Sequence, residues 1–226
     1  MPVNTARPDI VPVSPSVSER TYQALLDRIV ARDIAAGEVL EERRLSELLD
    51  VSRTPLRAAL NRLLGEGILT RLSNGSIMVR TFGATELVEL LHVRRLLESD
   101  AAAMATGRIP EDRLAAVRER LEALIGEPDV ALDADWVMDN EVHELVATHC
   151  GNKSMAEIIA DARRRVRMCN VERLPGRALL ARHEHLAIVV ALQSGDGDRA
   201  RHAMASHLDS VRSAFIKSMG FASYDA

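Results

Sequence analysis

The chain has 226 residues, of which 47% are hydrophobic and only 3% aromatic, and its formal net charge is −4. This length suffices for one large or two small domains, and the acidic balance excludes a protein that binds nucleic acid through bulk positive charge. Two cysteines are too few for a disulfide framework, and neither a membrane-spanning run nor a signal-peptide pattern is found. We therefore expect a cytoplasmic, mainly α-helical protein.

The chain opens with residues 1–16, which contain four prolines and no apolar periodicity, so a flexible tail is predicted there. The first helix is predicted to begin at Ser18 and to end at Ala36–Gly37, because apolar side chains recur along it at helical spacing. A short extended piece is predicted at residues 38–40.

Residues 51–64 form the next predicted helix, and its start is marked in the sequence. Ser52 or Thr54 can cap it, because a short hydroxyl accepts a hydrogen bond from the free N–H groups of the first turn. Pro55 follows where a helix tolerates proline, in that same first turn.

Arg53, Arg57 and Asn61 recur every four residues along this helix, on a face away from its leucines. Arg can pair with guanine and Asn with adenine, so this face suits the major groove of DNA. An amphipathic segment at residues 43–49 precedes the helix, which completes a helix-turn-helix pattern. The simpler alternative is a helical hairpin whose arginine face is only solvated.

A β-hairpin is predicted directly after this helix. Two β-rich runs, at residues 67–72 and 77–80, flank an Asn74–Gly75 turn. A hairpin in this position is the wing of a winged helix.

These motifs resemble the winged-helix domain of the GntR family of bacterial transcription regulators, over about residues 22–80. Ala58 departs from the family pattern, which usually has Glu after the arginine. The resemblance implies that DNA is contacted by the first arginine of the second helix, the cap of the third helix, the arginine that follows it and the wing-tip glycine. These positions are Arg43, Ser52, Arg53, Thr54, Arg57 and Gly75.

The predicted DNA-binding domain spans residues 17–80, and residues 81–84 form a predicted linker. Residues 85–219 carry only helical signals, interrupted by glycine and proline, and a short tail follows at 220–226. We expect an antiparallel all-α bundle. Its helices are predicted at residues 85–106, 110–125, 132–148, 153–171, 176–194 and 197–219.

All seven histidines lie in this second part of the chain. Asp139 and His143 are four residues apart and project from one helix face. His185 and His207 lie about equally far from the Gly195–Gly197 turn, so two antiparallel helices would bring them face to face. One carboxylate and three imidazoles suit a divalent transition metal. The alternative is that these are ordinary surface or hydrogen-bonded histidines.

The same positions resemble the FCD ligand-binding domain of the FadR-like subfamily, over about residues 84–217. The signature is an Asp and a His four residues apart, then a Glu-His pair and a His-Leu pair on later helices. Six helices would place the chain with the shorter, VanR-like group. The resemblance implies a metal ion, most commonly zinc or nickel, held by Asp139, His143, His185 and His207.

Such a metal can keep open positions that a carboxylate fills. Arg94 and one of Arg163, Arg164 or Arg167 could add forked hydrogen bonds to the same anion, so the expected effector is a small organic acid. The alternative for Arg94 is a surface salt bridge with Glu98, one turn further on.

We therefore expect a homodimeric transcriptional regulator, not an enzyme, that reads a palindromic operator and contains zinc or a similar metal. One alternative is a metal-dependent hydrolase or lyase that uses the Asp/His site. Its nearest candidate bases, Glu144 and Glu184, are expected to face outward. A third possibility retains the fold without the metal, so that the bundle serves mainly as a dimer interface.

Overall fold

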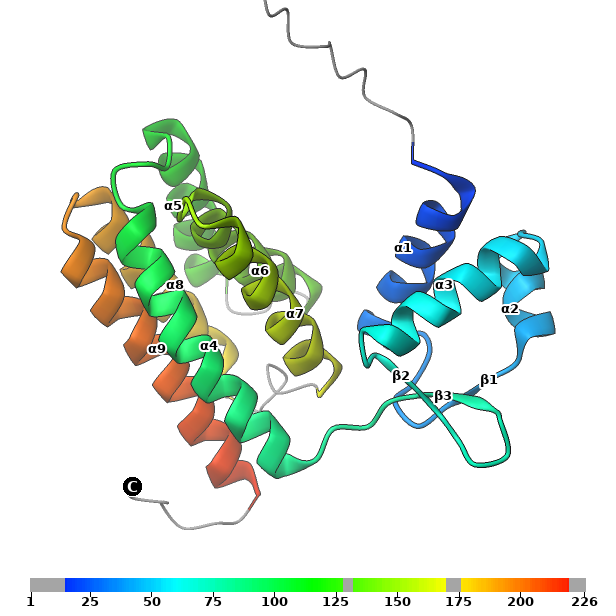
Figure 1. Cartoon of the computed structure of the whole chain (residues 1–226). Helices are drawn as coiled ribbons and strands as arrows, with labels where there is room; N and C mark the ends of the chain where they lie inside the picture. The colour runs from blue at the N-terminus through cyan, green and yellow to red at the C-terminus, as the bar shows by residue number, and fades with distance from the viewer. Residues whose placement is uncertain (1–14, 128–131, 170–175, 220–226) are drawn as a thin grey trace, which may run out of the picture. The chain divides into compact units, whose positions relative to one another are not determined.

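The structure is a computed structural model that describes residues 15–127, 132–169 and 176–219. Apart from residues 15 and 16, both predicted tails lie outside the described residues. The chain divides into two compact units, Met1–Arg80 and Thr81–Ala226 (Figure 1).

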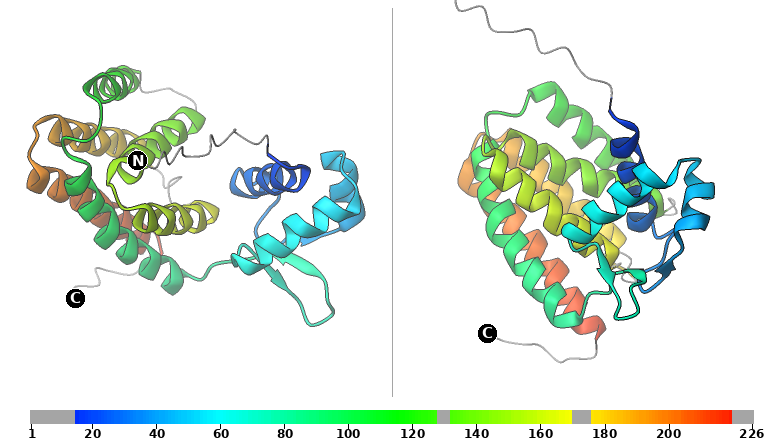
Figure 2. Two further views of the ribbon diagram at one scale, coloured as in Figure 1. Left: turned by 45° about the horizontal axis from the view of Figure 1, so that its top comes forward. Right: turned by 45° about the vertical axis from the view of Figure 1, so that its right-hand side comes forward.

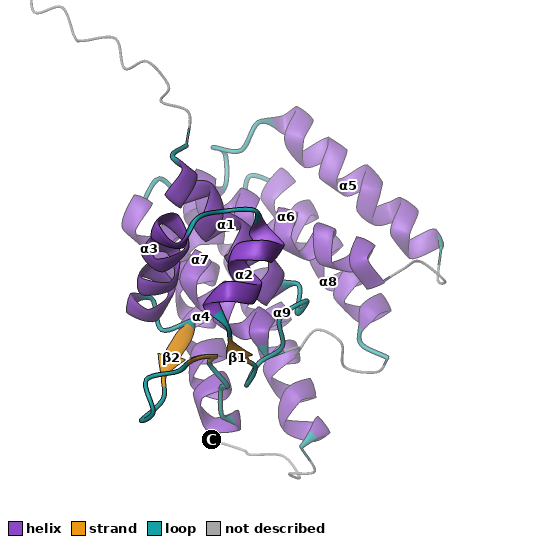
Figure 3. Ribbon diagram, turned by 90° about the vertical axis from the view of Figure 1, so that its right-hand side faces the viewer, coloured by secondary structure: helices purple, strands orange, loops and turns teal. Residues whose placement is uncertain are grey.

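The first unit is a winged helix-turn-helix. Its three strands form an antiparallel sheet in the order β1-β3-β2, in which Thr70 is opposite Met78. Figure 3 shows strands of this sheet in orange, near the helices α1, α2 and α3 of the same unit. Its elements are α1 (Val17–Val30), β1 (Val39–Leu40), α2 (Glu42–Leu49), α3 (Arg53–Gly65), β2 (Leu69–Arg71) and β3 (Ile77–Val79).

The first helix is shorter than its apolar periodicity predicts. Ser16 caps it by accepting a hydrogen bond of 3.1 Å from the backbone N–H of Glu19, and it ends at Val30 instead of Ala36–Gly37. Arg32 has a φ of 67°, which a right-handed helix cannot contain. Ile34 is nevertheless buried. The apolar periodicity therefore correctly predicted which side chains are buried, but it predicted the length of the helix wrongly.

The core of the first unit lies between α1 and α3. Leu25, Leu56 and Leu63 are fully buried there. Burying each such side chain contributes about 1.5–3 kcal/mol. This burial holds α3 by its apolar face and leaves its other face free for solvent or a partner.

The second unit contains only helices among its described residues. They are α4 (Ala84–Ala105), α5 (Glu111–Gly126), α6 (Leu132–His149), α7 (Lys153–Met168), α8 (Ala178–Gln193) and α9 (Gly197–Ser218). The predicted end of the α7 segment at residue 171 lies outside the described residues. The predicted start of α8 at residue 176 is two residues early, because Gly176 has a φ of +74°.

Helix α4 packs against α6, α7 and α9, and α8 packs against α5 and α9. Figures 1 and 2 show α4 and α9 side by side. At the end of the pair a Cβ on Gly197 would lie 3.2 Å from the Ala103 carbonyl oxygen, so glycine allows the close approach. Val93, an apolar residue of α4, is 39% exposed.

A large apolar cluster fills the centre of this unit and includes the fully buried Leu121, Ile188 and Met204. The buried polar residues of the chain are concentrated on the same helices, where α4, α6, α8 and α9 meet. None of the described helices combines the length and hydropathy needed to cross a membrane.

Candidate metal centre and nucleic-acid interface

Three helices of the second unit place four metal-ligating side chains together. Helix α6 provides Asp139 and His143, α8 provides His185, and α9 provides His207. All four are buried, and their ligand atoms lie within 4.8 Å of one another. The structure therefore brings together all four residues of the predicted metal set.

The arrangement fits a metal ion. The Nε2 atoms of His143 and His207 are 3.3 Å apart, and His185 Nε2 is 3.3 Å from Asp139 Oδ1. His185 Nε2 is buried and has no hydrogen-bond partner in the described structure. Buried polar atoms are rarely left in this state, and a bound cation would satisfy this lone pair. Three nitrogens and one oxygen suit a divalent transition metal.

Two carboxylates, the buried Glu98 and the partly buried Glu184, orient the histidines from behind. Glu98 of α4 contacts His143 Nδ1, and Glu184 of α8 lies 2.8 Å from His207 Nδ1. A carboxylate on Nδ1 fixes the ring so that Nε2 points at the metal position and becomes a better donor. The expectation that Glu184 faces outward is wrong, because its side chain is turned toward His207. Glu144 is exposed, as expected.

Arginines hold these carboxylates. Arg94 Nε lies 2.6 Å from Glu98, and both side chains are buried, so the pair forms inside the bundle and not at the surface. Arg177 forms two hydrogen bonds with Glu184, the shorter being 2.6 Å.

Arg163 of α7 lies 2.8 Å from the second oxygen of Asp139. It is therefore the arginine of its run that reaches the site. Arg167 instead stacks on the ring of Trp136, at 4.5 Å. The sequence analysis did not identify Arg177 as a residue of the site. Its spacing of seven residues from Glu184, which is about two helical turns, was a signal that could have paired the two side chains.

Burial keeps His143 and His207 neutral. Burial lowers the pKa of His143 to about 3, with further lowering by the nearby Arg163 and partial compensation by Glu98. Burial also lowers the pKa of His207 to about 4, helped by His185. Neutral imidazoles have free lone pairs near pH 7, which metal binding requires.

The carboxylates remain charged despite their burial. Burial opposes ionisation of Glu184, but hydrogen bonds from His207 and Arg177 outweigh it and lower its pKa to about 2. The pKa of Asp139 is likewise held well below its usual range against burial, first by Arg163. The site therefore offers a charged oxygen ligand at neutral pH.

A cavity opens beside the four ligands. Asp139, His185 and His207 form part of its wall. Arg94 and Arg177 reach it from α4 and α8. Arg182 lines it as well and is held by Asp135 at 2.6 Å. The rest of the wall is largely apolar, and its side chains are Leu121, Trp136, Met138, Ala178, Ala181 and Val211.

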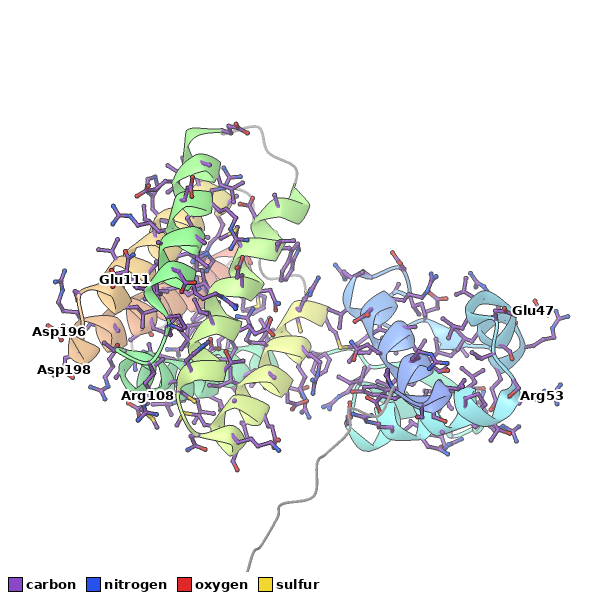
Figure 4. The ribbon with its side chains drawn as sticks, turned by 90° about the horizontal axis from the view of Figure 1, so that it is seen from above. Glu47, Arg53, Arg108, Glu111, Asp196 and Asp198 are labelled. Atoms are coloured by element: carbon purple, nitrogen blue, oxygen red, sulfur yellow. The ribbon has the colours of Figure 1, made fainter. Side chains whose placement is uncertain are left out.

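The residues predicted to contact DNA are exposed on the first unit. Ser52 precedes α3 as its N-cap residue without a side-chain capping bond, and Arg53 and Thr54 begin the helix. Figure 4 shows Arg53 projecting away from this unit. The hydroxyls and guanidiniums at this helix end are therefore accessible to a partner.

Two of the predicted DNA-contacting arginines have acidic neighbours on α2. Arg57 Nε lies 2.9 Å from Glu42, although the arginine side chain is 63% exposed. Arg43 lies 3.9 Å from Glu47 and is more exposed still. Exposed pairs of this kind contribute little to stability, so they can open toward a phosphate or a base at small cost.

The tip of the wing needs a glycine. Gly75 has a φ of +87°, in the left-handed region, and its surroundings are open. Asn74 Oδ1 accepts a hydrogen bond from the backbone N–H of Ser76, and Arg71 donates to the Gly75 carbonyl over 3.2 Å. Arg71 is an exposed cation at the wing tip that the sequence analysis did not single out.

A winged helix-turn-helix joined to a helical domain with a buried ligand site defines a class, the DNA-binding transcriptional regulators with a separate sensor domain. Residues 17–79 match the family described as bacterial regulatory proteins, gntR family, and residues 89–210 match the FCD domain. The chain belongs to the GntR family of regulators and carries an FCD domain.

Similar proteins of known class are also regulators. The Nta operon transcriptional regulator of Aminobacter aminovorans is 28% identical over 172 residues, covering 76% of this chain and 81% of its own. The HTH-type transcriptional repressor RspR of Escherichia coli K12 is 26% identical over 211 residues, covering 92% of each chain. These relatives and both domains are transcriptional regulators and not enzymes, so the hydrolase or lyase alternative is wrong.

Solved structures share the fold. McbR/YncC of E. coli has a TM-score of 0.78 at 20% identity, over 91% of this chain and all (100%) of that one. The metal-free FCD domain of TM0439 has a TM-score of 0.54 at 18% identity, over 62% of this chain and 98% of that one. At such identities the likeness concerns the fold alone, and it confirms the predicted winged helix followed by a helical bundle.

Proposed function

We propose that this regulator is a homodimer that reads a palindromic operator and responds to a small organic acid bound beside a metal ion in the FCD domain. The observation that carries the proposal is the convergence of Asp139, His143, His185 and His207 on one point, with carboxylates behind two of the imidazoles. FCD domains can bind metal, and a site so preorganised is costly to maintain without a ligand.

In this proposal α3 enters the major groove. Arg53 and Thr54 contribute at its N-terminal end, where backbone N–H groups also favour phosphate, and Arg57 lies one turn further on the same face. Arg43 of α2 contacts the phosphate backbone. Gly75 lets the wing backbone approach the minor groove, because it has no side chain and adopts a positive φ.

The metal, which we propose to be zinc, would be held by the four converging ligands and would act as a Lewis acid that anchors one carboxylate of the effector. Arg94 and Arg177 line the adjacent cavity and can donate forked hydrogen bonds to the acid. Aromatic and aliphatic side chains along the wall, such as Trp136 and Val211, would cover its carbon skeleton.

Helix α4 links the site to the rest of the chain. It carries Arg94 and Glu98, and it is the first helix after the predicted linker at residues 81–84. An acid bound by Arg94 acts directly on this helix. Regulation then requires only that the acid bind one arrangement of the two units more tightly than another.

The first test is elemental analysis of the purified full-length protein, with His143→Ala beside it and the exposed His202→Ala as control. We expect about one transition-metal ion per chain in the wild type and in His202→Ala, and none in His143→Ala. The absence of metal from all three proteins would contradict the metal site.

The second test selects operator sequences from random DNA with the full-length protein. A palindromic consensus is expected, because a two-fold dimer reads two equal half-sites. A single unpaired half-site would contradict the dimeric reading while leaving the DNA-binding activity in place.

A further inference from the structure

The site and its cavity are surrounded by guanidinium–carboxylate pairs. Each pair cancels its own charge, so these four pairs contribute no net charge before a metal binds. The pairs are Arg94–Glu98 at 2.6 Å, Arg163–Asp139 at 2.8 Å, Arg177–Glu184 at 2.6 Å and Arg182–Asp135 at 2.6 Å.

A divalent metal changes this balance by two charges. Imidazoles must be neutral to bind a metal, so the three histidines do not compensate it. All four ligands are buried, and uncompensated charge in such surroundings is costly. The loaded site therefore has two positive charges without a partner among the described residues.

A further charge beside the cavity wall has the same sign. Arg167 lies over the ring of Trp136, a residue of the cavity wall, at 4.5 Å. The remaining acidic side chains that the structure describes on α6, Glu141 and Glu144, are directed to Arg120 and Asn140. The cavity thus favours anions and favours a doubly charged anion most.

The shape of the cavity adds a second requirement. Its wall combines the metal-ligating face of His185 and His207 and the guanidiniums of Arg94 and Arg177 with apolar side chains such as Leu121. Inorganic phosphate or sulfate has the charge but no carbon to cover the apolar part. A small dicarboxylate has both.

We infer that the effector is a dicarboxylate dianion, with one carboxylate toward the metal ligands and the other toward the arginines. This inference rests on the proposed function of the same site and narrows its ligand class from organic acids to diacids.

The test compares diacids with their monoamides, which have nearly the same size and one charge less. Succinate and succinamate, and glutarate and glutaramate, are titrated into zinc-loaded full-length protein by calorimetry. We expect at least one diacid to bind tenfold or more tightly than its monoamide, and we expect this ratio to fall toward one in metal-free protein. Equal binding of both members, or no binding of any diacid to loaded protein, would overturn the inference.

Inorganic phosphate and sulfate form a separate arm. If they bind as tightly as the best diacid, two charges suffice and the dicarboxylate assignment is overturned. If they bind at least tenfold more weakly, the carbon skeleton contributes as the apolar wall predicts.

Charge variants test the same inference through the ratio of the monoamide Kd to the diacid Kd. Arg177→Gln removes one positive charge and should narrow the ratio, and Glu184→Gln removes one negative charge and should widen it. Arg95→Gln on α4 breaks an exposed pair with Asp209 and should leave the ratio unchanged. Structural damage to the pocket would weaken the binding of diacid and monoamide alike and leave the ratio unchanged, so a changed ratio reports the effect of charge. Equal ratios in all variants would contradict the inference.

The outcomes distinguish a failure of the diacid inference from a failure of the proposed metal site on which it rests. If no metal is bound in the elemental analysis, the proposed metal site fails and the diacid inference fails with it. If metal is bound and monoamides bind as well as diacids, the metal site stands and only the diacid inference is wrong.

Discussion

Glu98 lies between a cation and a metal ligand. It accepts a hydrogen bond from Arg94 Nε at 2.6 Å and contacts His143 Nδ1, and it is fully buried. In the proposed metal site its charge would act on the metal through the imidazole. Glu184 lies in the same way between Arg177 and His207. In both cases an arginine contacts a carboxylate, and that carboxylate contacts the imidazole of a predicted metal ligand.

Glu98→Gln should weaken metal binding about 10–100-fold, because the amide orients His143 but does not raise the basicity of the ring as a carboxylate does. Competition with a chromophoric chelator measures the zinc affinity. The control is Glu141→Gln, which changes an exposed carboxylate on α6. Equal zinc affinity in the wild type and Glu98→Gln would mean that Glu98 only packs against the imidazole.

The buried histidines predict how stability of the metal-free protein depends on pH. Burial lowers the pKa of His143 to about 3 and of His207 to about 4, whereas the unfolded chain titrates them near 6.5. Between about pH 6.5 and the lowered pKa values only the unfolded chain takes up these protons. The free energy of unfolding therefore decreases as the pH is lowered, by up to about 1.4 kcal/mol per pH unit for each histidine. Glu98 and Glu184 have lowered pKa values and add a further loss of stability below about pH 4.5.

Urea denaturation of the metal-free protein between pH 7.5 and 5 measures this loss. His143→Gln should show a smaller pH slope than the wild type, and His202→Gln, which changes an exposed histidine, should not. A stability that does not fall toward pH 5 would contradict the neutral, buried state of the two rings.

At the scale of elements, α3 is held by its leucines and presents its arginines. Leu56, Leu60 and Leu63 are buried, while Arg53 and Arg57 are exposed on the other side. Arg57→Ala should cost about 1–3 kcal/mol of DNA-binding free energy and relax specificity at one base position, if Arg57 forks onto a base. Measurements on a selected operator and its single-base variants separate the two effects.

Arg28→Ala on α1 is the matched control for Arg57→Ala, because Arg28 is also a partly exposed arginine of the first unit with an acidic neighbour, Asp33. It should leave operator affinity nearly unchanged. A loss in Arg57→Ala that is equal on all DNA sequences would show that Arg57 contacts only phosphate.

The wing depends on one backbone conformation at its tip. Gly75→Ala places a Cβ at a φ of +87° and should cost about 1 kcal/mol of stability and weaken operator binding, because the turn shifts to relieve strain. Gly65→Ala in α3 is the control: Gly65 has open surroundings and no left-handed φ, so alanine should be neutral or stabilising. Thermal unfolding measures the stability of both variants, and operator titration measures their DNA affinity. Equal stability and equal operator affinity of the two variants would contradict the requirement for glycine at position 75.

At the scale of the whole molecule, the two units have separate cores, and the proposed metal site belongs to the second unit. Zinc at a free concentration of 100 times its Kd should stabilise the second unit by about 2.7 kcal/mol and leave the first unit unchanged. Trp136, the one tryptophan of the chain, belongs to the second unit, so its fluorescence follows unfolding there. Circular dichroism follows both units.

His143→Ala should abolish the zinc-induced shift seen through Trp136. A zinc-dependent shift that persists in His143→Ala would place the stabilising ion elsewhere in the chain. An equal shift of both transitions in the wild type would show that the units unfold as one body.

Much of this protein follows from local patterns. Helical periodicity located every described helix except the end of α1 to within a few residues, and the Asn74–Gly75 pair located the wing. Asp139 and His143 could be paired because one helical turn separates them. The pairing of His185 with His207 also needed no tertiary information, because a short turn between antiparallel helices determines which positions meet.

The residues missed or misjudged depend on contacts between distant segments. Glu98 and His143 are 45 residues apart, and nothing near either one in the sequence indicates that they meet. Glu184 was assigned outward by its helix position, yet Arg177 and His207 satisfy its charge inside the bundle. The DNA-contacting role of Arg43, Arg53 and Arg57 stays a prediction, because it depends on a partner outside the chain.

Helix period, turn chemistry and short spacings were enough to predict the class of fold, the winged helix and the convergence of Asp139, His143, His185 and His207. Only the tertiary structure decided where α1 ends, which arginines face the site and which carboxylates lie behind the histidines. A buried charge is stable only beside its counter-charge, and the counter-charge of Asp139, Arg163, comes from another helix, as does the carboxylate behind the neutral His143.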